Sequence, residues 1–288
     1  MKATILGAAN AWHVEVLIKA FAERNVSVNV LRTRDLKALI NDDLISVNEA
    51  DLGDVILVRS LPGGSLEQVI FRVDLLHVLE EVKGARVINS PDALEKTVDK
   101  MYATALLSKA GLRVPETCVT ERYDDAMAAF AELGGDVVVK PVFGSEGRGM
   151  TRVSDPETAH RVFMALNQYR YVYYLQRFIP HGNRDIRTFV VNGSVIAAME
   201  RLSYDWRCNV ALGAQASLLV PDENLIDLSL KAADAVGTFY AGVDILPSEE
   251  GELYLLEVNG IPGWRGLQQV AKPDIASTIV EALLGLNP

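Results

Sequence analysis

Two carboxylates and an amide near the C-terminus have the types and the spacing of a divalent-cation site. The segments 242–246 and 252–260 each read as a short, mostly apolar strand, and the polar link between them is typical of a hairpin turn. In an antiparallel pair these strands can set Asp244 beside Glu257, and Glu257 and Asn259 point to the same face. Oxygen ligands of this kind suit Mg²⁺ or Mn²⁺. The alternative is that acidic side chains on this hairpin are only hydrated.

A lysine and a glycine-rich loop in the middle of the chain have the chemistry of a phosphate site. Lys140 ends a run of valines, and burying its charge is costly unless an anion lies beside it. Glycines in the next loop would let backbone amides approach phosphate oxygens closely. The residues of interest in this loop are Gly144, Ser145, Gly147 and Gly149. A glycine-rich hairpin without a ligand is the alternative, and Lys100 alone would pass for a surface lysine of a helix.

Further polar side chains follow on the strands after residue 175. A strand that leads into a loop carries Gln176, Arg177, Phe178 and Ile179. Asn192-Gly193 between two alternating segments predicts a hairpin. Asp185 and Arg187 share one face of the first strand of this hairpin, because side chains alternate along a strand.

Arg207 and Asn209 lie two residues apart beyond this hairpin. A single arginine on a strand is usually hydrated. Two arginines that occur together with two lysines and three metal-type ligands fit a clamp on a nucleoside triphosphate instead. These residues therefore predict a nucleotide and metal site.

The elements that must position these residues are read from the hydrophobic pattern. The N-terminal part is expected to contain strands at 3–6, 27–31, 55–58 and 85–89 and helices at 12–24, 71–83 and 91–95. This alternation predicts a small parallel α/β domain, and ligands of such sheets often bind beyond the strand ends. Trp12, His13 and Arg59 are therefore candidates for an acceptor pocket. The next part is expected to contain helices at 99–107 and 124–133 and strands at 117–120 and 137–140.

Composition narrows the class of protein. The chain has 288 residues, 49% of them hydrophobic and 23% charged, which is ordinary globular composition with room for two or three subdomains. The formal net charge of -10 argues against a nucleic-acid or anionic-membrane surface. No apolar run approaches a membrane span, and the first residues lack a secretory signal. The chain has only two cysteines, Cys118 and Cys208, so a disulfide framework is not expected. These features together predict a cytoplasmic protein.

Taken in order, the motifs resemble the ATP-grasp superfamily and specifically its RimK-like α-L-glutamate ligase branch. The resemblance rests on Asp99-Lys100, Val139-Lys140, the loop 144–149, Gln176 to Ile179, Asp185 to Arg187, Arg207 to Asn209, Gly242 to Asp244 and Glu257 to Asn259. It implies mixed α/β and α+β architecture, with a small N-terminal parallel α/β (pre-ATP-grasp) domain and two lobes that enclose ATP. The expected boundaries are 1–96 for the N-terminal domain, 97–175 for the small lobe with the glycine-rich loop, and 176–288 for the C-terminal lobe with the metal site.

The resemblance also implies roles for single residues. The nucleotide would be bound by Lys100, Lys140, Gly144, Ser145, Gly147, Gly149, Gln176, Arg177, Phe178, Ile179 and Asp185. The metal ions would be held by Asp244, Glu257 and Asn259, and the transferring phosphoryl group would be faced by Arg187, Arg207 and Asn209. The reaction implied is attack of a substrate carboxylate on the γ-phosphate of ATP, followed by displacement of phosphate from the acyl phosphate by an amine.

The segment after Asn259 departs from the pattern of the glutamate ligases. Where those enzymes tend to have a small or acidic stretch, this chain has Trp264 and Arg265 among glycines. These two side chains could stack on a flat ring and pair with a carboxylate, or the tryptophan could pack inside the lobe while the arginine is hydrated. The candidate substrate residues are Arg59, Arg72, Trp264 and Arg265.

Cofactors and partners follow from the same resemblance. They are ATP, Mg²⁺ (or Mn²⁺), L-glutamate and a carboxylate acceptor, expected to be a small cofactor such as a tetrahydromethanopterin-like pterin, or a carboxyl terminus. Another amino acid, a peptide or carrier-protein acceptor, and a non-catalytic ATP-binding protein are the alternatives. A homo-oligomer, dimer or tetramer, is expected, with no nucleic-acid or membrane partner.

Overall fold

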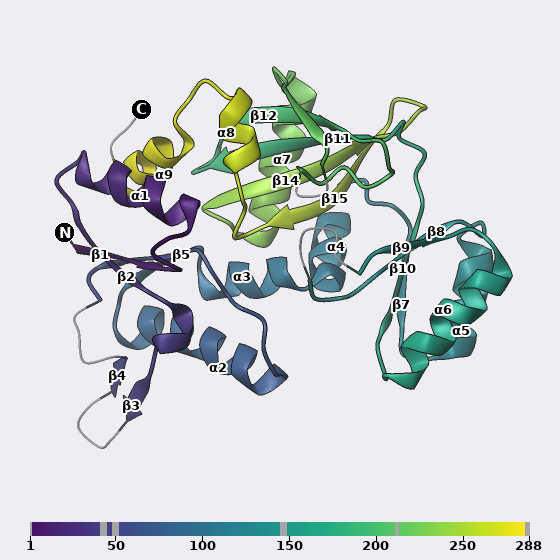
Figure 1. The fold of residues 1–288 in the computed structure, drawn as a ribbon, viewed down its shortest axis with the longest axis horizontal. Helices are drawn as coiled ribbons and strands as arrows, with labels where there is room; N and C mark the ends of the chain where they lie inside the picture. The colour runs from purple at the N-terminus through teal and green to yellow at the C-terminus, as the bar shows by residue number, and fades with distance from the viewer. Residues whose placement is uncertain (1, 41–44, 48–51, 145–148, 211–212, 286–288) are drawn as a thin grey trace.

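The N-terminal part of the chain forms a parallel sheet of four strands in the order β2-β1-β5-β6 (Figure 1). The computed structural model describes residues 2–40, 45–47, 52–144, 149–210 and 213–285. The strands are β1 (Lys2–Leu6), β2 (Ser27–Leu31), β5 (Val55–Val58) and β6 (Arg86–Ile88), with the helices α1 (Trp12–Ala22), α2 (Leu66–His77) and α3 (Pro91–Val98). All four residues of β5 are buried, as expected for a central parallel strand. The parallel α/β prediction is confirmed.

One local prediction in this part was wrong, and one element was not predicted. The helix expected from residue 71 begins at Leu66, because Ser65 and Gln68 form a reciprocal capping box around its first turn. It ends at His77 and is followed by a π-helical turn. A short hairpin of β3 (Ala38–Ile40) and β4 (Ile45–Val47) was not expected.

A second, antiparallel sheet has the order β7-β10-β8-β9. It contains β7 (Thr117–Thr120), β8 (Val137–Lys140), β9 (Thr151–Val153) and β10 (Tyr173–Arg177), and it is covered by α5 (Tyr123–Glu132) and α6 (Pro156–Gln168). Phe163 and Tyr173 pack in its core, with ring centroids 5.6 Å apart. Tyr169 and Tyr171 do not join this core and are 72% and 61% exposed, because they lie where α6 ends and before β10 begins.

The third sheet is the largest and has the order β13-β12-β11-β14-β15. Its strands are β11 (Arg184–Val191), β12 (Ser194–Leu202), β13 (Gln215–Leu218), β14 (Tyr240–Pro247) and β15 (Leu253–Asn259). The helices α7 (Glu223–Val236) and α4 (Lys100–Lys109) pack against it. Every residue of β14 is buried. This strand carries Asp244, and it is therefore packed on both of its faces.

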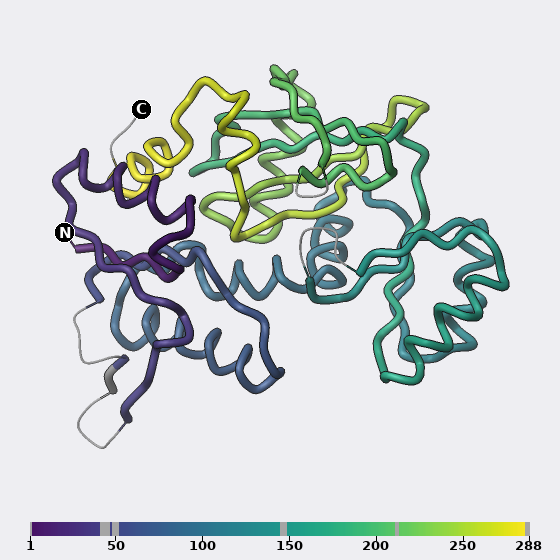
Figure 2. The backbone as a smooth tube through the Cα atoms, in the orientation of Figure 1, coloured from purple at the N-terminus to yellow at the C-terminus, as the bar shows by residue number. Residues whose placement is uncertain are grey.

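The end of the chain returns to the N-terminal domain. After α8 (Arg265–Val270), the last helix α9 (Ile275–Leu284) packs on α1, and Figure 2 shows the yellow end of the tube beside the purple start. One hydrophobic core joins the N-terminal sheet to the third sheet. The Asn89 side chain, at the end of β6, donates to the carbonyl oxygens of Tyr240 (2.8 Å) and Gly260 (2.6 Å) and thereby ties the two parts together.

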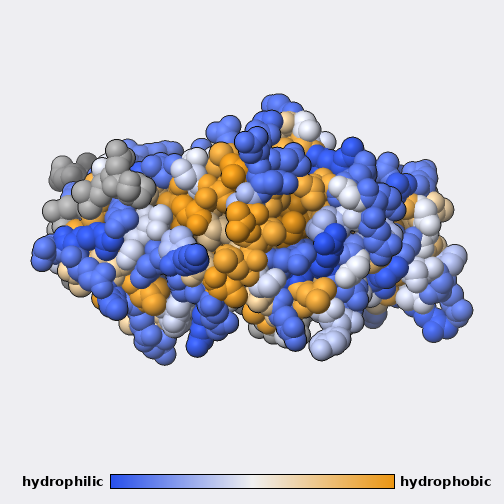
Figure 3. Space-filling view, turned by 90° about the horizontal axis from the view of Figure 1, so that it is seen from above, coloured by the Kyte–Doolittle hydropathy of each residue, from blue (hydrophilic) through white to orange (hydrophobic). Residues whose placement is uncertain are grey.

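The surface of the molecule has both apolar and hydrophilic areas. Figure 3 shows apolar residues gathered in the middle of one face, whereas both ends of the molecule are mostly hydrophilic. In the part of the chain that the structure describes, no helix has the length and apolar composition to cross a membrane.

Candidate active site

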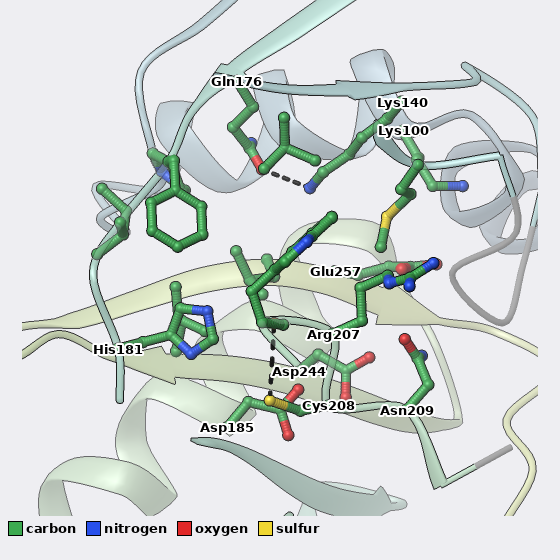
Figure 4. Close-up of a pocket in the computed structure, with 18 of the residues that line it drawn as sticks. Lys100, Lys140, Gln176, His181, Asp185, Arg207, Cys208, Asn209, Asp244 and Glu257 are labelled. Atoms are coloured by element: carbon green, nitrogen blue, oxygen red, sulfur yellow. Dashed lines mark hydrogen bonds between the residues drawn. The ribbon is translucent and has the colours of Figure 1, made fainter. Parts of the chain in front are cut away.

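A cavity of about 960 Å³, including its part open to solvent, lies between the second and third sheets (Figure 4). It brings together most of the residues that the sequence singled out. Those that line it are Lys100, Lys140, Gly144, Gln176, Arg177, Phe178, Ile179, Asp185, Arg207, Asn209, Asp244 and Glu257. Of the other predicted residues, Ser145 and Gly147 lie outside the described part of the chain. Gly149, at φ 77°, is in the left-handed region that favours glycine.

Two lysines supply positive charge at one end of the cavity. Lys140 ends β8 and donates to Oε1 of Gln176, and burial lowers the pKa of Lys140 to about 8. Lys100 begins α4, whose first turn is capped by the Asp99 side chain, and its Nζ donates to the carbonyl oxygen of Gly144. Lys100 therefore contacts the start of the glycine-rich loop. An anion beside Lys140 would offset the cost of burying its charge, and Lys100 lies close enough to contact the same anion.

The carboxylates of the hairpin lie as expected. Asp244 and Glu257 are direct partners across β14 and β15, and a bulge follows them between Asp244 and Ile245. Asp244 accepts from Nδ2 of Asn259 (3.3 Å), so the three predicted metal ligands form one cluster. This cluster was predicted from strand alternation.

The donor set of this cluster fits a hard divalent cation. Burial raises the pKa of Glu257, and no hydrogen bond or ion pair to its carboxylate occurs among the described residues. Two carboxylates and an amide oxygen are the ligands that Mg²⁺ or Mn²⁺ takes in phosphate-handling sites. Asp244, Glu257 and Asn259 would therefore hold the ion.

Arg201 is the charged side chain of the site that the sequence analysis missed. Its Nε and Nη2 donate to the two carboxylate oxygens of Asp185, both at 2.6 Å, and Nη2 also donates to Oδ1 of Asp244 at 2.7 Å. Burial alone would lower the pKa of Arg201, but the two carboxylates raise it above its ordinary value, so the guanidinium stays charged. Arg201 thus links the strands β11, β12 and β14 beneath the cavity.

The register of the β11–β12 hairpin decides which residue lies opposite Asp185. A regular two-residue loop at Asn192-Gly193 would place Glu200 opposite Asp185. A bulge between Phe189 and Val190 shifts the register by one residue and places Arg201 there instead. The sequence shows the hairpin but not the bulge.

The three residues expected to face the phosphoryl group are in two different positions. Arg207 and Asn209 line the cavity, and Arg207 is anchored by Asp205, whose carboxylate lies 2.8 Å from Nε. Arg187 is buried below the cavity, where Nη1 donates to Oδ2 of Asp244 at 2.9 Å. Arg187 therefore contacts a predicted metal ligand and does not line the cavity.

Aromatic rings line part of the cavity around Phe178. Phe178 has the guanidinium of Arg152 over its ring, 3.5 Å from the centroid, and Trp206 against its edge. His181 and Cys208 are among the lining residues that the sequence did not assign to the site. His181 is 5% exposed, and Cys208 has a thiol whose pKa burial raises to about 12, so Cys208 is not a nucleophile.

The candidate substrate residues do not line the cavity. Trp264 is 1% exposed and packs against His13 and Phe189, so the idea that it stacks on a substrate is wrong and the packing alternative holds. Arg59 lies over the Trp264 ring at 4.5 Å and donates to Pro262. Arg72 is buried and donates to the carbonyl oxygen of Pro62.

Arg265, the remaining candidate, is exposed at the start of α8, with its guanidinium 5.9 Å from the Trp12 ring. Arg59, Trp264 and Arg265 therefore lie at the contact between the N-terminal domain and the third sheet. The sequence could not show this, because the contact depends on the return of the chain through α8 and α9.

Two antiparallel sheets that enclose paired lysines and an oxygen-ligand cluster are typical of the ATP-grasp class of nucleotide-dependent enzymes. The chain belongs to the RimK-like ATP-grasp family, whose domain matches residues 97–283. It is therefore an ATP-dependent ligase of the carboxylate–amine type.

Named relatives cover almost the whole chain. A tetrahydromethanopterin:alpha-L-glutamate ligase of Methanosarcina acetivorans is 33% identical over 94% of this chain and 95% of its own length. An alpha-aminoadipate–LysW ligase LysX of Sulfurisphaera tokodaii is 31% identical over 94% of each protein. Among solved structures, the ATP-grasp ligase PsnB complexed with minimal precursor has a TM-score of 0.79 at 22% identity, with 99% of both chains covered. That last likeness concerns the fold alone.

Proposed function

We propose that this ligase joins L-glutamate, through its amino group, to the carboxylate of a small pterin cofactor of the tetrahydromethanopterin type. The observation that carries the proposal is the cavity itself, in which two lysines and a carboxylate cluster lie within one enclosure. Relatives named for tetrahydromethanopterin match at 31–34% identity and relatives named LysX at 28–33%, so the choice of the pterin over a carrier protein rests on charge. An acidic carrier would meet a chain of net charge -10.

The chemistry proceeds in two steps. An acceptor carboxylate oxygen attacks the γ-phosphorus of ATP, the bond to the β–γ bridging oxygen breaks, and an acyl phosphate and ADP result. The amine of glutamate then attacks the acyl carbon, phosphate leaves, and the nitrogen loses a proton as the amide forms. No side-chain nucleophile is required, which agrees with the raised pKa of the Cys208 thiol.

The residues of the cavity act by charge and position. Lys100 and Lys140 would neutralise the phosphates, and Arg207 would face the charge that develops on the transferring group. Arg187 and Arg201 hold the two oxygens of Asp244 in place. Bound Mg²⁺ would supply Lewis-acid neutralisation of the phosphate charge.

The proposal also includes the cellular location and the oligomeric state of the enzyme. We place it in the cytoplasm, where ATP and glutamate are available, and we expect a dimer or tetramer. The apolar area of Figure 3 is the face on which such copies would meet. Light scattering that gives a monomer at working concentration would contradict the oligomer.

Phosphate release is the test of the proposed function. The protein is incubated with ATP, Mg²⁺ and L-glutamate, and a tetrahydromethanopterin-type pterin, a deazaflavin cofactor or a glutamate-ended peptide is added separately. We expect phosphate release with the pterin, and a product whose mass is greater by one glutamyl residue. Turnover only with the peptide, or only with another amino acid, would replace the proposed substrates.

A further inference from the structure

His181 is a side chain of the cavity whose hydrogen-bonding roles are fixed by its surroundings. It lies in the loop between β10 and β11, is 5% exposed and lines the cavity. Its Nδ1 lies 3.1 Å from the carbonyl oxygen of Arg184. A carbonyl oxygen can only accept, so Nδ1 carries the proton and Nε2 is left as an acceptor.

The ring is held in this state and orientation. Burial lowers the pKa of His181 below its usual value, so the ring is neutral near pH 7. Its face is tilted against Phe178, with ring centroids 5.6 Å apart. Among the described residues no donor lies within hydrogen-bond distance of Nε2. A bound ligand can therefore supply the donor.

The position of His181 selects the part of the nucleotide that it meets. In Figure 4 it lies across the cavity from Lys100 and Lys140, so it faces the nucleoside and not the phosphates. Two other acceptors of the cavity already accept hydrogen bonds from the protein, unlike Nε2 of His181. Both oxygens of Asp185 accept from Arg201 at 2.6 Å, and Oε1 of Gln176 accepts from Lys140.

We propose that Nε2 of His181 accepts a hydrogen bond from a ribose hydroxyl of ATP and makes the enzyme select ribonucleotides over deoxyribonucleotides. The inference rests on ATP being the nucleotide, as proposed above. The ring nitrogens of adenine are acceptors and cannot pair with Nε2, whereas sugar hydroxyls can donate. The exocyclic amine of adenine is the other donor of the nucleoside, and the test separates it from the sugar.

Two substitutions at position 181 form a matched pair. Gln places an amide oxygen near the position of Nε2, whereas Asn can replace only the Nδ1 donor. The KM values of wild type, His181→Gln and His181→Asn are measured for ATP, 2′-deoxy-ATP, 3′-deoxy-ATP and the triphosphate of purine riboside, which lacks the 6-amino group. We expect wild type and His181→Gln to show a KM about 10-fold higher for one deoxy analogue than for ATP, which is the loss of one hydrogen bond.

In His181→Asn, the KM for ATP should rise to the value for that analogue, and the two nucleotides should no longer differ. If His181→Asn keeps the wild-type ratio, the proposal is overturned. The same holds if the ratio that changes is that between ATP and purine riboside triphosphate, because the contact is then to the base.

Two controls keep the result interpretable. Should His181→Asn fail to fold, equal KM values of the wild type for ATP and both deoxy analogues would by themselves overturn the proposal. ATP binding by the wild type is measured separately by calorimetry. Absence of any ATP binding would refute the proposed function, whereas binding without sugar discrimination would refute only the role of His181.

Discussion

Glu257 is the residue whose environment most directly calls for a cation. Its carboxylate is buried in the cavity with a raised pKa, while neighbouring Asp244 is already contacted by two arginines. The charges of Lys100, Lys140 and Arg187 oppose this rise, but none of them forms an ion pair with the carboxylate, and a bound cation would compensate it directly. Glu257 is therefore the predicted ligand whose substitution should affect metal binding most.

Glu257→Gln should lower kcat by about 100-fold or more, because it keeps the shape of the side chain but removes a charged metal ligand. Glu252, on the same hairpin, pairs on the surface with Arg113, so Glu252→Gln is the matched control and should keep activity. Activity is measured as phosphate release over a range of Mg²⁺ concentrations. Wild-type turnover in the Glu257 variant would refute the metal assignment.

Lys140 gives a pH dependence to nucleotide binding. Burial lowers its pKa to about 8, so the free enzyme loses this charge as the pH rises through that value. We expect the Kd for ATP to increase from about pH 8 upward, by at most about 10-fold per pH unit. Lys140→Arg keeps its charge and should give a flatter profile. A wild-type Kd that stays constant between about pH 7 and pH 9.5 would contradict this role.

At the scale of elements, the hairpin of β11 and β12 decides the charge arrangement beneath the cavity. Its bulge places Arg201 against Asp185 and Asp244, and all three side chains are nearly buried. Removing the guanidinium leaves the buried carboxylate of Asp185 without its partner and leaves Asp244 paired with Arg187 alone. Such a change destabilises a protein much more than the loss of a surface pair.

Arg201→Met should therefore lower the free energy of unfolding by about 3–5 kcal/mol. Arg184→Met, on the neighbouring strand, removes a partly exposed pair with Glu200 and should cost about 1 kcal/mol or less. Urea unfolding of both variants measures the difference. Equal effects would show that the Arg201 network does not stabilise the sheet.

Local patterns determined most of the elements around the site. The strands at 55–58, 117–120 and 137–140 were predicted with their observed bounds, because runs of β-branched residues are bounded by turn residues. Strand alternation likewise predicted the Asp244–Glu257 pair. Arg201 and the burial of Trp264 were not predicted, since one depends on a bulge and the other on contacts between distant segments.

At the scale of the whole molecule, His13 joins the N-terminal part of the chain to the segment that follows Asn259. Its Nε2 accepts from the backbone N–H of Trp264 at 2.9 Å, and its ring packs on the indole. Burial, followed by the charges of Arg59 and Arg265, lowers the pKa of His13 to about 4. The folded protein therefore holds this histidine neutral.

Stability should fall as the pH drops below the unfolded-state value of about 6.5, because between there and about 4 the unfolded chain binds a proton that the folded protein does not. His13→Gln removes this titration and should make the free energy of unfolding less dependent on pH in that window. Unfolding followed at several pH values tests this. If the free energy of unfolding of His13→Gln depends on pH as in the wild type, His13 does not contribute to this pH dependence. The exposed His160 provides the matched control, and His160→Gln should leave the pH dependence unchanged.

Transfer of oxygen from the acceptor to phosphate tests the central claim most directly. The pterin acceptor is labelled with ¹⁸O in its carboxylates and incubated with ATP, Mg²⁺, L-glutamate and the enzyme. An acyl phosphate requires that one ¹⁸O atom appear in each phosphate released, and mass spectrometry should detect it. Phosphate without label, formed together with the glutamylated product, would contradict the mechanism that the site implies.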